Sequence, residues 1–211
     1  QMCIRDRQNT GITKISKRLL PSSIVVVFGG SYGIGKDIVE ICEQYGAHVY
    51  SFSRSLNGID VSKQEDVAKV LKEISEKEGR IDAVINTAGL LDKVPLSNMD
   101  YEEIYKSIYI NYIGAIIIAK ESYFYLKQTK GTLLLFTSSS YTRGRSLYSL
   151  YSSSKAAIVN FTQALSEEWY DQGIRINCIN PERTKTPMRI KNFGVEPEAC
   201  LLYTSPSPRD T

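Results

Sequence analysis

The sequence has little histidine, little net charge and no long apolar run. Its single histidine, His48, lies in a strand-like segment, which argues against a Ser-His-Asp triad or a histidine metal site. The net charge of +3 is too small to predict nucleic-acid binding. The longest apolar run, Ile113–Ala119, is too short to cross a bilayer. We therefore expect no metal site, no nucleic-acid partner and no membrane partner.

Cysteine is also scarce, and two of the four cysteines lie in segments of unusual sequence. Residues 1–7 and the first six residues of the segment 200–211 back-translate to codons that are reverse complements over most of their length. We expect both segments to be adapter-derived artefacts that flank a fragment, and we set them aside before fold reasoning. Cys42 and Cys178 remain, and helix-like and strand-like surroundings predict buried thiols. This usage is typical of a reducing, cytoplasmic compartment.

The remaining residues suffice for one domain. Residues 8–23 are polar and basic and are expected to form a linker. Residues 24–199 are expected to form the domain, incomplete at its C-terminal end. Strands are expected at 24–28, 47–52, 81–86, 132–137 and 174–179. Helices are expected at 36–45, 62–79 (with a Ser62–Glu65 capping box), 100–129 and 151–170. This alternation predicts an α/β fold with a Rossmann-like, doubly wound parallel sheet, truncated at the C-terminal end.

A glycine-rich segment directly follows the first expected strand. The sequence GGSYGIG at 29–35 connects that strand to a helical pattern. Glycines permit a tight turn and close backbone approach, and a helix N-terminus offers N–H groups to a pyrophosphate. Strand, turn and helix together indicate a dinucleotide site. The residues expected to contact the cofactor here are Gly29, Ser31, Tyr32, Gly33, Ile34 and Gly35.

The end of the second expected strand indicates which dinucleotide is bound. NAD enzymes usually place an acid there for the ribose hydroxyls, whereas this chain has Ser53, Arg54 and a further serine. A guanidinium beside hydroxyls suits a 2′-phosphate, which predicts NADP. The alternative is that Arg54 is a solvated loop residue. Asp60 and Val61 are expected to form a strand end beside the adenine.

The third and fourth expected strands end in further candidate site residues. Asn86, Ala88 and Gly89 follow the third strand, and the small residues there would let the cofactor ribose approach the backbone. Asn111 lies within an apolar helical run and needs a hydrogen-bond partner. That partner is either a neighbouring backbone group or a water that links Asn111 to a lysine of the site described next.

The segment Ser138–Lys155 carries a proton-transfer pattern. Ser138 ends the fourth strand, and Tyr151 and Lys155 are four residues apart, so that a helix places them on one face. The lysine charge is expected to lower the tyrosine pKa, and the serine hydroxyl can hold a substrate carbonyl. The alternative is a surface tyrosine beside a solvated lysine.

Together these motifs resemble the short-chain dehydrogenase/reductase family over Ile24–Met188. The family's T-G-x-x-x-G-I-G corresponds to F-G-G-S-Y-G-I-G, its N-N-A-G to N-T-A-G, and its Y-x-x-x-K to Tyr151 and Lys155. Its P-G-x-x-x-T corresponds to P-E-R-T-K-T at 181–186. Its helix asparagine and its serine thirteen positions before the tyrosine match Asn111 and Ser138. The departures are Phe28, Thr87 and Glu182.

The resemblance implies an NADP-dependent oxidoreductase that transfers a hydride between NADPH and a carbonyl or alcohol substrate. Tyr151 would be the general acid in reduction, and Ser138 would orient the carbonyl. Lys155 would hold the nicotinamide ribose and lower the Tyr151 pKa, and Asn111 would hold a relay water. The last motif would bring Pro181 and Thr186 to the nicotinamide. A homo-oligomer, formed through the helices around Asn111 and Tyr151, is also implied.

Cations gather around the expected substrate mouth and suit an anionic, phosphorylated substrate. They are Arg143, Arg145, Arg183, Lys185, Arg189 and Lys191. The alternative is that they contact the cofactor pyrophosphate or solvent. The sequence NPERTKTPMR resembles reductase domains that accompany cytidylyltransferases of ribitol-phosphate pathways. This resemblance implies reduction of ribulose 5-phosphate to ribitol 5-phosphate and a cytidylyltransferase domain upstream.

Two other functions remain open on the sequence. One is a reductase of acyl-thioesters or small neutral carbonyls. The other is a non-catalytic NADP-binding sensor, although a sensor would not need the Ser138, Tyr151 and Lys155 set.

Overall fold

The computed structural model describes residues 21–181 and 184–195. Both segments expected to be adapter-derived, the expected linker up to residue 20, and Glu182 and Arg183 lie outside the described residues. The same holds for the last residues of the expected domain, 196–199.

Five parallel strands form one sheet in the order β2-β1-β3-β4-β5. They are β1 (Ile24–Phe28), β2 (His48–Phe52), β3 (Ala83–Asn86), β4 (Thr132–Phe136) and β5 (Arg175–Ile179). All five strands predicted from the sequence are therefore present. Strand β1 lies inside the sheet and is buried along its whole length, as its continuous β-branched sequence requires.

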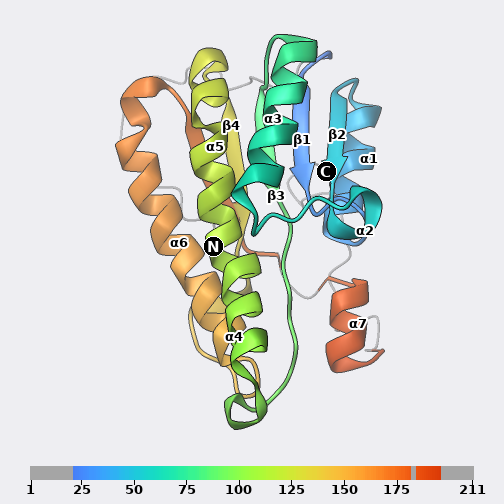
Figure 1. The fold of residues 1–211 in the computed structure, drawn as a ribbon, viewed down its shortest axis with the longest axis vertical. Coiled ribbons are helices and arrows are strands. Elements are labelled where there is room, and N and C mark those ends of the chain that lie inside the picture. Colours follow the sequence, from blue (N-terminus) through green and yellow to red (C-terminus); the bar gives the residue numbers. More distant parts are fainter. Residues whose placement is uncertain (1–20, 182–183, 196–211) are drawn as a thin grey trace, which may run out of the picture.

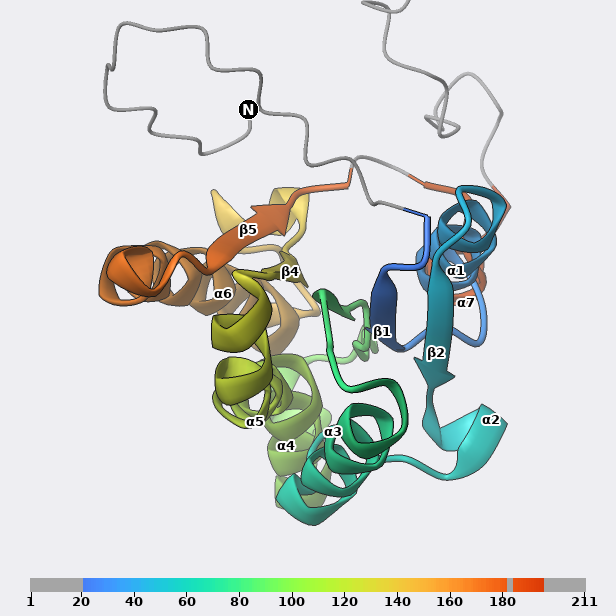
Figure 2. The same ribbon diagram turned by 90° about the horizontal axis from the view of Figure 1, so that it is seen from above.

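Seven α-helices connect and flank the strands in the described part of the chain. They are α1 (Ile34–Gln44), α2 (Arg54–Asn57), α3 (Gln64–Glu78), α4 (Tyr101–Ile108), α5 (Gly114–Thr129), α6 (Ser149–Glu168) and α7 (Pro187–Phe193). Figure 1 shows α3, α5 and α6 side by side in front of the sheet. Figure 2 shows that α1 covers the opposite face, so the sheet is doubly wound as predicted. No helix among the described residues is both long enough and apolar enough to cross a bilayer.

The hydrophobic core has one part on each face of the sheet. Val26 and Phe28 of β1 pack with residues of α3, α5 and α6, including Leu71, Ile118 and Ile158. Their neighbours Val25 and Val27 point the other way and pack with Cys42 and Ile38 of α1. Because successive strand side chains alternate between faces, β1 connects both parts of the core.

The predicted helix 100–129 contains an irregularity at Asn111. Helices α4 and α5 are joined without a break by a π-helical turn, Tyr109–Ile113. Directly after it, Gly114 lies so close to Val61 that a Cβ there would be 2.9 Å from Val61 Cγ2. The α4 N-terminus has a capping box formed by Asp100 and Glu103, which the sequence analysis did not identify.

Two local predictions around residue 60 are wrong. Asp60 and Val61 lie in a loop rather than at a strand end. The helix α3 has Lys63 as its N-cap, so the Ser62–Glu65 capping box does not form. The reason is that the Ser62 hydroxyl donates instead to Asp60 Oδ1, at 2.7 Å.

The strand register positions the candidate site. Phe28, at the end of β1, is in register with Phe52 of β2 on one side and Asn86 of β3 on the other. Three strands therefore end at one level, and their following residues converge there. The chain order reverses between β1 and β3, and such a switch point at the carboxyl ends is where open α/β sheets bind ligands.

Candidate active site

A cavity of about 530 Å³ opens at this switch point. Its walls come from the glycine-rich turn, the β2–α2 segment, residues 87–89, α6 and residues 181–188. Sixteen of the seventeen positions predicted to contact the cofactor line it, and only Asn86 does not. They are Gly29, Ser31, Tyr32, Gly33, Ile34, Gly35, Ser53, Arg54, Asp60, Val61, Ala88, Gly89, Tyr151, Lys155, Pro181 and Thr186.

The glycine-rich turn requires glycine at three positions. Gly29 has φ +89°, and a Cβ there would lie 2.5 Å from the Ala88 backbone nitrogen. Gly33, the N-cap of α1, has φ +59°. A Cβ on Gly35 would collide with the Gly29 carbonyl oxygen. This close packing brings the N-terminus of α1 to the cavity wall, where its free N–H groups can face an anion.

Asn86 and Thr87 shape the cavity by fixing the turn after β3. Asn86 is buried, and its side-chain oxygen accepts a hydrogen bond from the Ala88 N–H at 3.0 Å. Thr87, which departs from the family pattern, donates its hydroxyl to the Phe28 carbonyl at 3.0 Å and lines the cavity. Asn86 thus holds the backbone of the turn without lining the cavity, whereas Thr87 lines the cavity.

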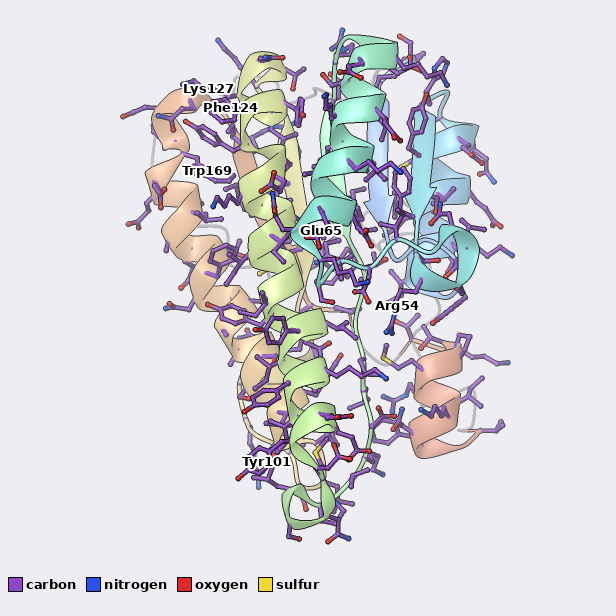
Figure 3. The ribbon with its side chains drawn as sticks, in the orientation of Figure 1. Arg54, Glu65, Tyr101, Phe124, Lys127 and Trp169 are labelled. Atoms are coloured by element: carbon purple, nitrogen blue, oxygen red, sulfur yellow. The ribbon has the colours of Figure 1, made fainter. Side chains whose placement is uncertain are left out.

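A cluster of hydroxyls and one guanidinium lies at the end of β2. Ser55 donates to Ser31 of the glycine-rich turn at 3.1 Å, and the Oγ atoms of Ser53 and Ser55 are 3.3 Å apart. The side chain of Arg54 lies between α2 and α7 in Figure 3. Its Nη1 is 3.9 Å from Asp60 Oδ2. This arrangement offers charge and hydroxyl donors to a phosphate.

The environment of Asp60 keeps its carboxylate charged. Burial would raise the pKa of Asp60, but hydrogen bonds from the Ser62 hydroxyl and N–H, together with the Arg54 charge, hold that pKa below its ordinary value. Asp60 therefore stays anionic at neutral pH and partly offsets the Arg54 charge.

Ser138 and Tyr151 meet as the sequence predicted they would. Ser138 directly follows β4, and Tyr151 lies in the first turn of α6. The Ser138 hydroxyl hydrogen-bonds the Tyr151 hydroxyl, an interaction that lowers the Tyr151 pKa. Burial outweighs it, and with a contribution from Tyr148 the pKa of Tyr151 is raised above its ordinary value of 10.0. The predicted lowering of the Tyr151 pKa by Lys155 is therefore not found in this structure.

The orientation of Lys155 explains that difference. Its ammonium is buried and donates to the Phe136 carbonyl of β4 at 2.8 Å, while Nζ lies 5.5 Å from the Tyr151 ring centroid. Burial lowers the pKa of Lys155 from 10.5 to about 8. Lys155 is therefore not a solvated lysine. Its ammonium hydrogen-bonds the β4 backbone and not the Tyr151 hydroxyl.

Asn111 hydrogen-bonds a neighbouring backbone group, which was one of its two expected partners. Its side-chain oxygen accepts from the Leu90 N–H at 2.9 Å, and its amide donates to the Leu90 carbonyl at 2.8 Å. A Cβ on Gly89 would be 3.3 Å from Asn111 Oδ1 and 3.8 Å from Lys155 Nζ. Asn111 and Lys155 therefore both border Gly89, and the relay water remains a prediction.

A second cavity of about 360 Å³, which we call the substrate cavity, adjoins the first and shares Tyr151 with it. Ser138, Arg145 and Arg189 lie in its wall. Of the other predicted mouth cations, Arg143 and Lys185 are exposed and line neither cavity. Lys191 pairs with Asp92 at 2.7 Å. Only two of the six cations are therefore placed in the substrate cavity, and Arg183 lies outside the described residues.

The short helix α7, not predicted from the sequence, closes one side of the substrate cavity. Thr186 caps it by accepting from the Arg189 N–H at 3.2 Å. The Asn192 amide donates to the Leu91 carbonyl at 2.8 Å and its oxygen accepts from the Lys93 N–H at 3.1 Å. These two hydrogen bonds tie α7 to the segment after β3.

Several lining residues of the first cavity were not predicted. They are Ile59, Thr87, Ile110, Phe136, Thr137 and Met188. Thr87 stands beside predicted residues and could have been found from that adjacency, whereas Ser55, which also lines the cavity, is the further serine expected beside Arg54. The apolar residues carry no comparable signal, because an apolar side chain in a strand or helix reads as core.

A switch-point cavity with a glycine-rich turn at one end and a Ser–Tyr–Lys set at the other defines the class of nicotinamide-dinucleotide oxidoreductases. Comparison with known proteins agrees with this class. Residues 23–194 match the short chain dehydrogenase family, and the chain belongs to that family. A nicotinamide dinucleotide, NAD or NADP, is therefore its cofactor.

The curated relatives differ in their similarity to this chain. The bifunctional ribulose 5-phosphate reductase/CDP-ribitol pyrophosphorylase Bcs1 of Haemophilus influenzae is 55% identical over 183 residues, or 87% of this chain. The chain spans only 38% of that relative's length. The 3-oxoacyl-[acyl-carrier-protein] reductase of Bos taurus is 28% identical, covering 78% of this chain and 77% of its own. A solved structure of an ElxO variant with NADPH bound has TM-score 0.75 and 25% identity, covering 81% of this chain and 78% of that chain.

Proposed function

We propose that this chain reduces the ketone of ribulose 5-phosphate to the alcohol of ribitol 5-phosphate, with NADPH as hydride donor. The observation that carries the proposal is the substrate cavity, where two arginines share one wall with Ser138 and Tyr151. A carbonyl at the hydroxyl pair and an anionic group at the guanidiniums suit a phosphorylated ketose. The name of the Haemophilus influenzae relative supports the same reaction.

The chemistry follows from the arrangement of the hydroxyls. The residues that line the first cavity would hold NADPH, which would supply the hydride for the carbonyl carbon. Ser138 and Tyr151 donate hydrogen bonds to the carbonyl oxygen and stabilise its growing negative charge. Tyr151 then transfers its proton to that oxygen, so that C=O, hydride and proton together give the alcohol. Because burial raises the Tyr151 pKa, the phenol is protonated at neutral pH, which is the form that an acid in reduction needs.

Lys155 supports the reaction by its position beside the cofactor site. Its ammonium donates to the Phe136 carbonyl and lies 5.5 Å from the Tyr151 ring centroid. The same group borders the first cavity, where it can donate to a ribose hydroxyl of the cofactor. Asn111 holds the Leu90 backbone beside both groups.

A direct assay tests the proposed reaction. NADPH oxidation should be followed by absorbance with ribulose 5-phosphate, ribulose, a neutral ketone and an acetoacetyl thioester. We expect the highest kcat/KM for ribulose 5-phosphate. Preference for the thioester would instead establish the acyl-thioester reductase alternative, and NADPH binding without turnover of any carbonyl would establish the sensor.

The hydroxyl cluster around Arg54 supports NADPH over NADH. We expect Arg54→Ala to weaken NADPH binding about 10- to 100-fold, because one charge-assisted contact to the 2′-phosphate is lost. NADH binding should change less than about twofold. Both dissociation constants can be measured by quenching of protein fluorescence, with the exposed Lys36→Ala of α1 as control. An equal loss for both cofactors would contradict the 2′-phosphate role.

Partners and location belong to the same proposal. A homo-oligomer is supported by aromatic side chains exposed along α4 and α5, among them Tyr101 at 74% and Phe124 at 70%, both labelled in Figure 3. A cytidylyltransferase partner is supported by the bifunctional name of the relative. The buried, unbridged thiol of Cys42 supports a reducing cytoplasm. Light-scattering mass of the purified chain tests the oligomer.

A further inference from the structure

The substrate cavity carries positive charge from two arginines in its wall. Arg145 and Arg189 both line it, and none of the described residues in its wall is an aspartate or glutamate. The other polar lining groups include the hydroxyls of Ser139, Ser140 and Tyr148. Two guanidiniums among hydroxyls form a surface suited to an anion with several acceptor oxygens.

Arg145 is held at a fixed place relative to Tyr151. Its backbone N–H donates to the hydroxyl of Ser152 at 3.3 Å, and Ser152 is the buried neighbour of Tyr151 on α6. The loop that carries Arg145 is thus anchored to the helical turn that carries the proposed proton donor. A ligand bound by both residues would therefore have a defined distance between its two anchored groups.

The Arg145 guanidinium has no ion pair or hydrogen bond with any residue that the structure describes, and the side chain is exposed. Arg189 differs, because its guanidinium lies 4.8 Å from the centre of the Phe193 ring on α7. The Arg145 guanidinium thus lies on the α6 side of the cavity without a described partner. The Arg189 guanidinium lies on the α7 side, beside the Phe193 ring.

We infer that Arg145 binds the phosphate group of the sugar-phosphate substrate and thereby determines substrate choice, with Arg189 completing the site from α7. This inference rests on the proposed function. The planar fork of a guanidinium matches two phosphate oxygens, and the phosphate charge complements the Arg145 guanidinium. With the carbonyl at Ser138 and Tyr151, the phosphate end of the ketose points into the Arg145 side of the same cavity.

The chain offers a matched control two residues away. Arg143 lies in the same loop, carries the same charge and is exposed, but it lines neither cavity. Arg143→Ala therefore removes the same charge from the surface without removing it from the substrate cavity. Arg145→Lys keeps the charge and loses the planar fork.

The experiment compares ribulose 5-phosphate with ribulose in the full chain. For Arg145→Ala we expect kcat/KM with ribulose 5-phosphate to fall about 100-fold, mostly through KM, as loss of a charged hydrogen-bonded contact predicts. With ribulose it should change less than about twofold. Arg145→Lys should be intermediate, and Arg143→Ala should match wild type. Inorganic phosphate should inhibit wild type competitively against ribulose 5-phosphate and inhibit Arg145→Ala much more weakly.

The outcomes separate this inference from the proposed function. Wild-type turnover of ribulose 5-phosphate with Arg145→Ala equal to Arg143→Ala overturns the Arg145 assignment alone. A wild-type chain that reduces ribulose as efficiently as its 5-phosphate overturns the phosphate site. A chain that reduces neither overturns the proposed function and, with it, this inference. NADPH binding by each variant verifies that the fold is retained.

Discussion

Tyr151→Phe is expected to lower kcat for carbonyl reduction by about 1,000-fold, within the range that loss of a general acid produces. The substitution removes one hydroxyl, the one that hydrogen-bonds Ser138. The ring stays, and its edge-to-face contact with Tyr148, with centroids 6.3 Å apart, does not depend on the hydroxyl. NADPH binding should therefore change only about twofold, because the lost hydroxyl acts in the transition state and not in cofactor binding.

The measurement is steady-state NADPH oxidation, with the dissociation constant of NADPH determined in parallel. Tyr148→Phe is the control, since Tyr148 lines the same cavity and loses the same atom. We expect it to retain activity within about fivefold. More than a tenth of wild-type kcat in Tyr151→Phe would show that another group delivers the proton.

The pH profile of reduction provides a second test of Tyr151. Its folded-state pKa is raised above the ordinary 10.0, mainly by burial, so the proton-donating form persists through neutral pH. A fall of the reduction rate caused by loss of this proton should therefore occur only in the alkaline range. A fall at neutral pH that Tyr151→Phe abolishes would contradict the raised pKa.

Lys155→Met is expected to make the chain more stable at pH 7 and much less active. The Lys155 ammonium is buried, and burial lowers its pKa from 10.5 to about 8. At about 1.4 kcal/mol for each pH unit of displacement, holding this charge inside costs about 3 kcal/mol. Methionine removes that cost but leaves the Phe136 carbonyl without its donor, a loss of about 1 kcal/mol. The free energy of unfolding should rise by about 2 kcal/mol.

The sign of the pH dependence follows from the lowered pKa. Between about pH 8 and 10.5 the unfolded state binds more protons than the folded state at Lys155, so wild-type stability rises with pH in that window relative to the variant. The cost of the buried charge is complete below pH 8 and absent above 10.5. The advantage of Lys155→Met should therefore disappear as the pH approaches 10.5.

Denaturant unfolding at several pH values measures this difference. Lys69→Met is the control, because Lys69 is exposed on α3, 4.0 Å from Glu73, and such pairs contribute under about 1 kcal/mol. Activity should fall about 10- to 100-fold in Lys155→Met, because the ammonium that borders the first cavity can no longer donate to a cofactor ribose hydroxyl, and a hydrogen bond to a charged group contributes about 1.5–3 kcal/mol. A variant destabilised at pH 7 would contradict the cost assigned to the buried charge.

The strands and the dinucleotide turn were predictable because their signals are local. The run Ile24–Phe28 is apolar and β-branched, and the glycines after it permit a backbone that other residues cannot adopt. The sequence placed Tyr151 and Lys155 on one helix face for the same reason, since spacing alone decides it. The predicted helix cap at Ser62 was wrong because its hydroxyl donates a hydrogen bond to the Asp60 side chain instead of capping α3.

The sequence by itself determined the parallel α/β architecture, the glycine-rich turn and the set of residues that could form the site. Only the tertiary structure decided how those residues behave. It directed the Lys155 ammonium at Phe136, paired Asn111 with Leu90, and placed Arg145 in the substrate cavity while Lys191 paired with Asp92. Burial and long-range partners set a side chain's charge and direction, and neither can be read from neighbours along the chain.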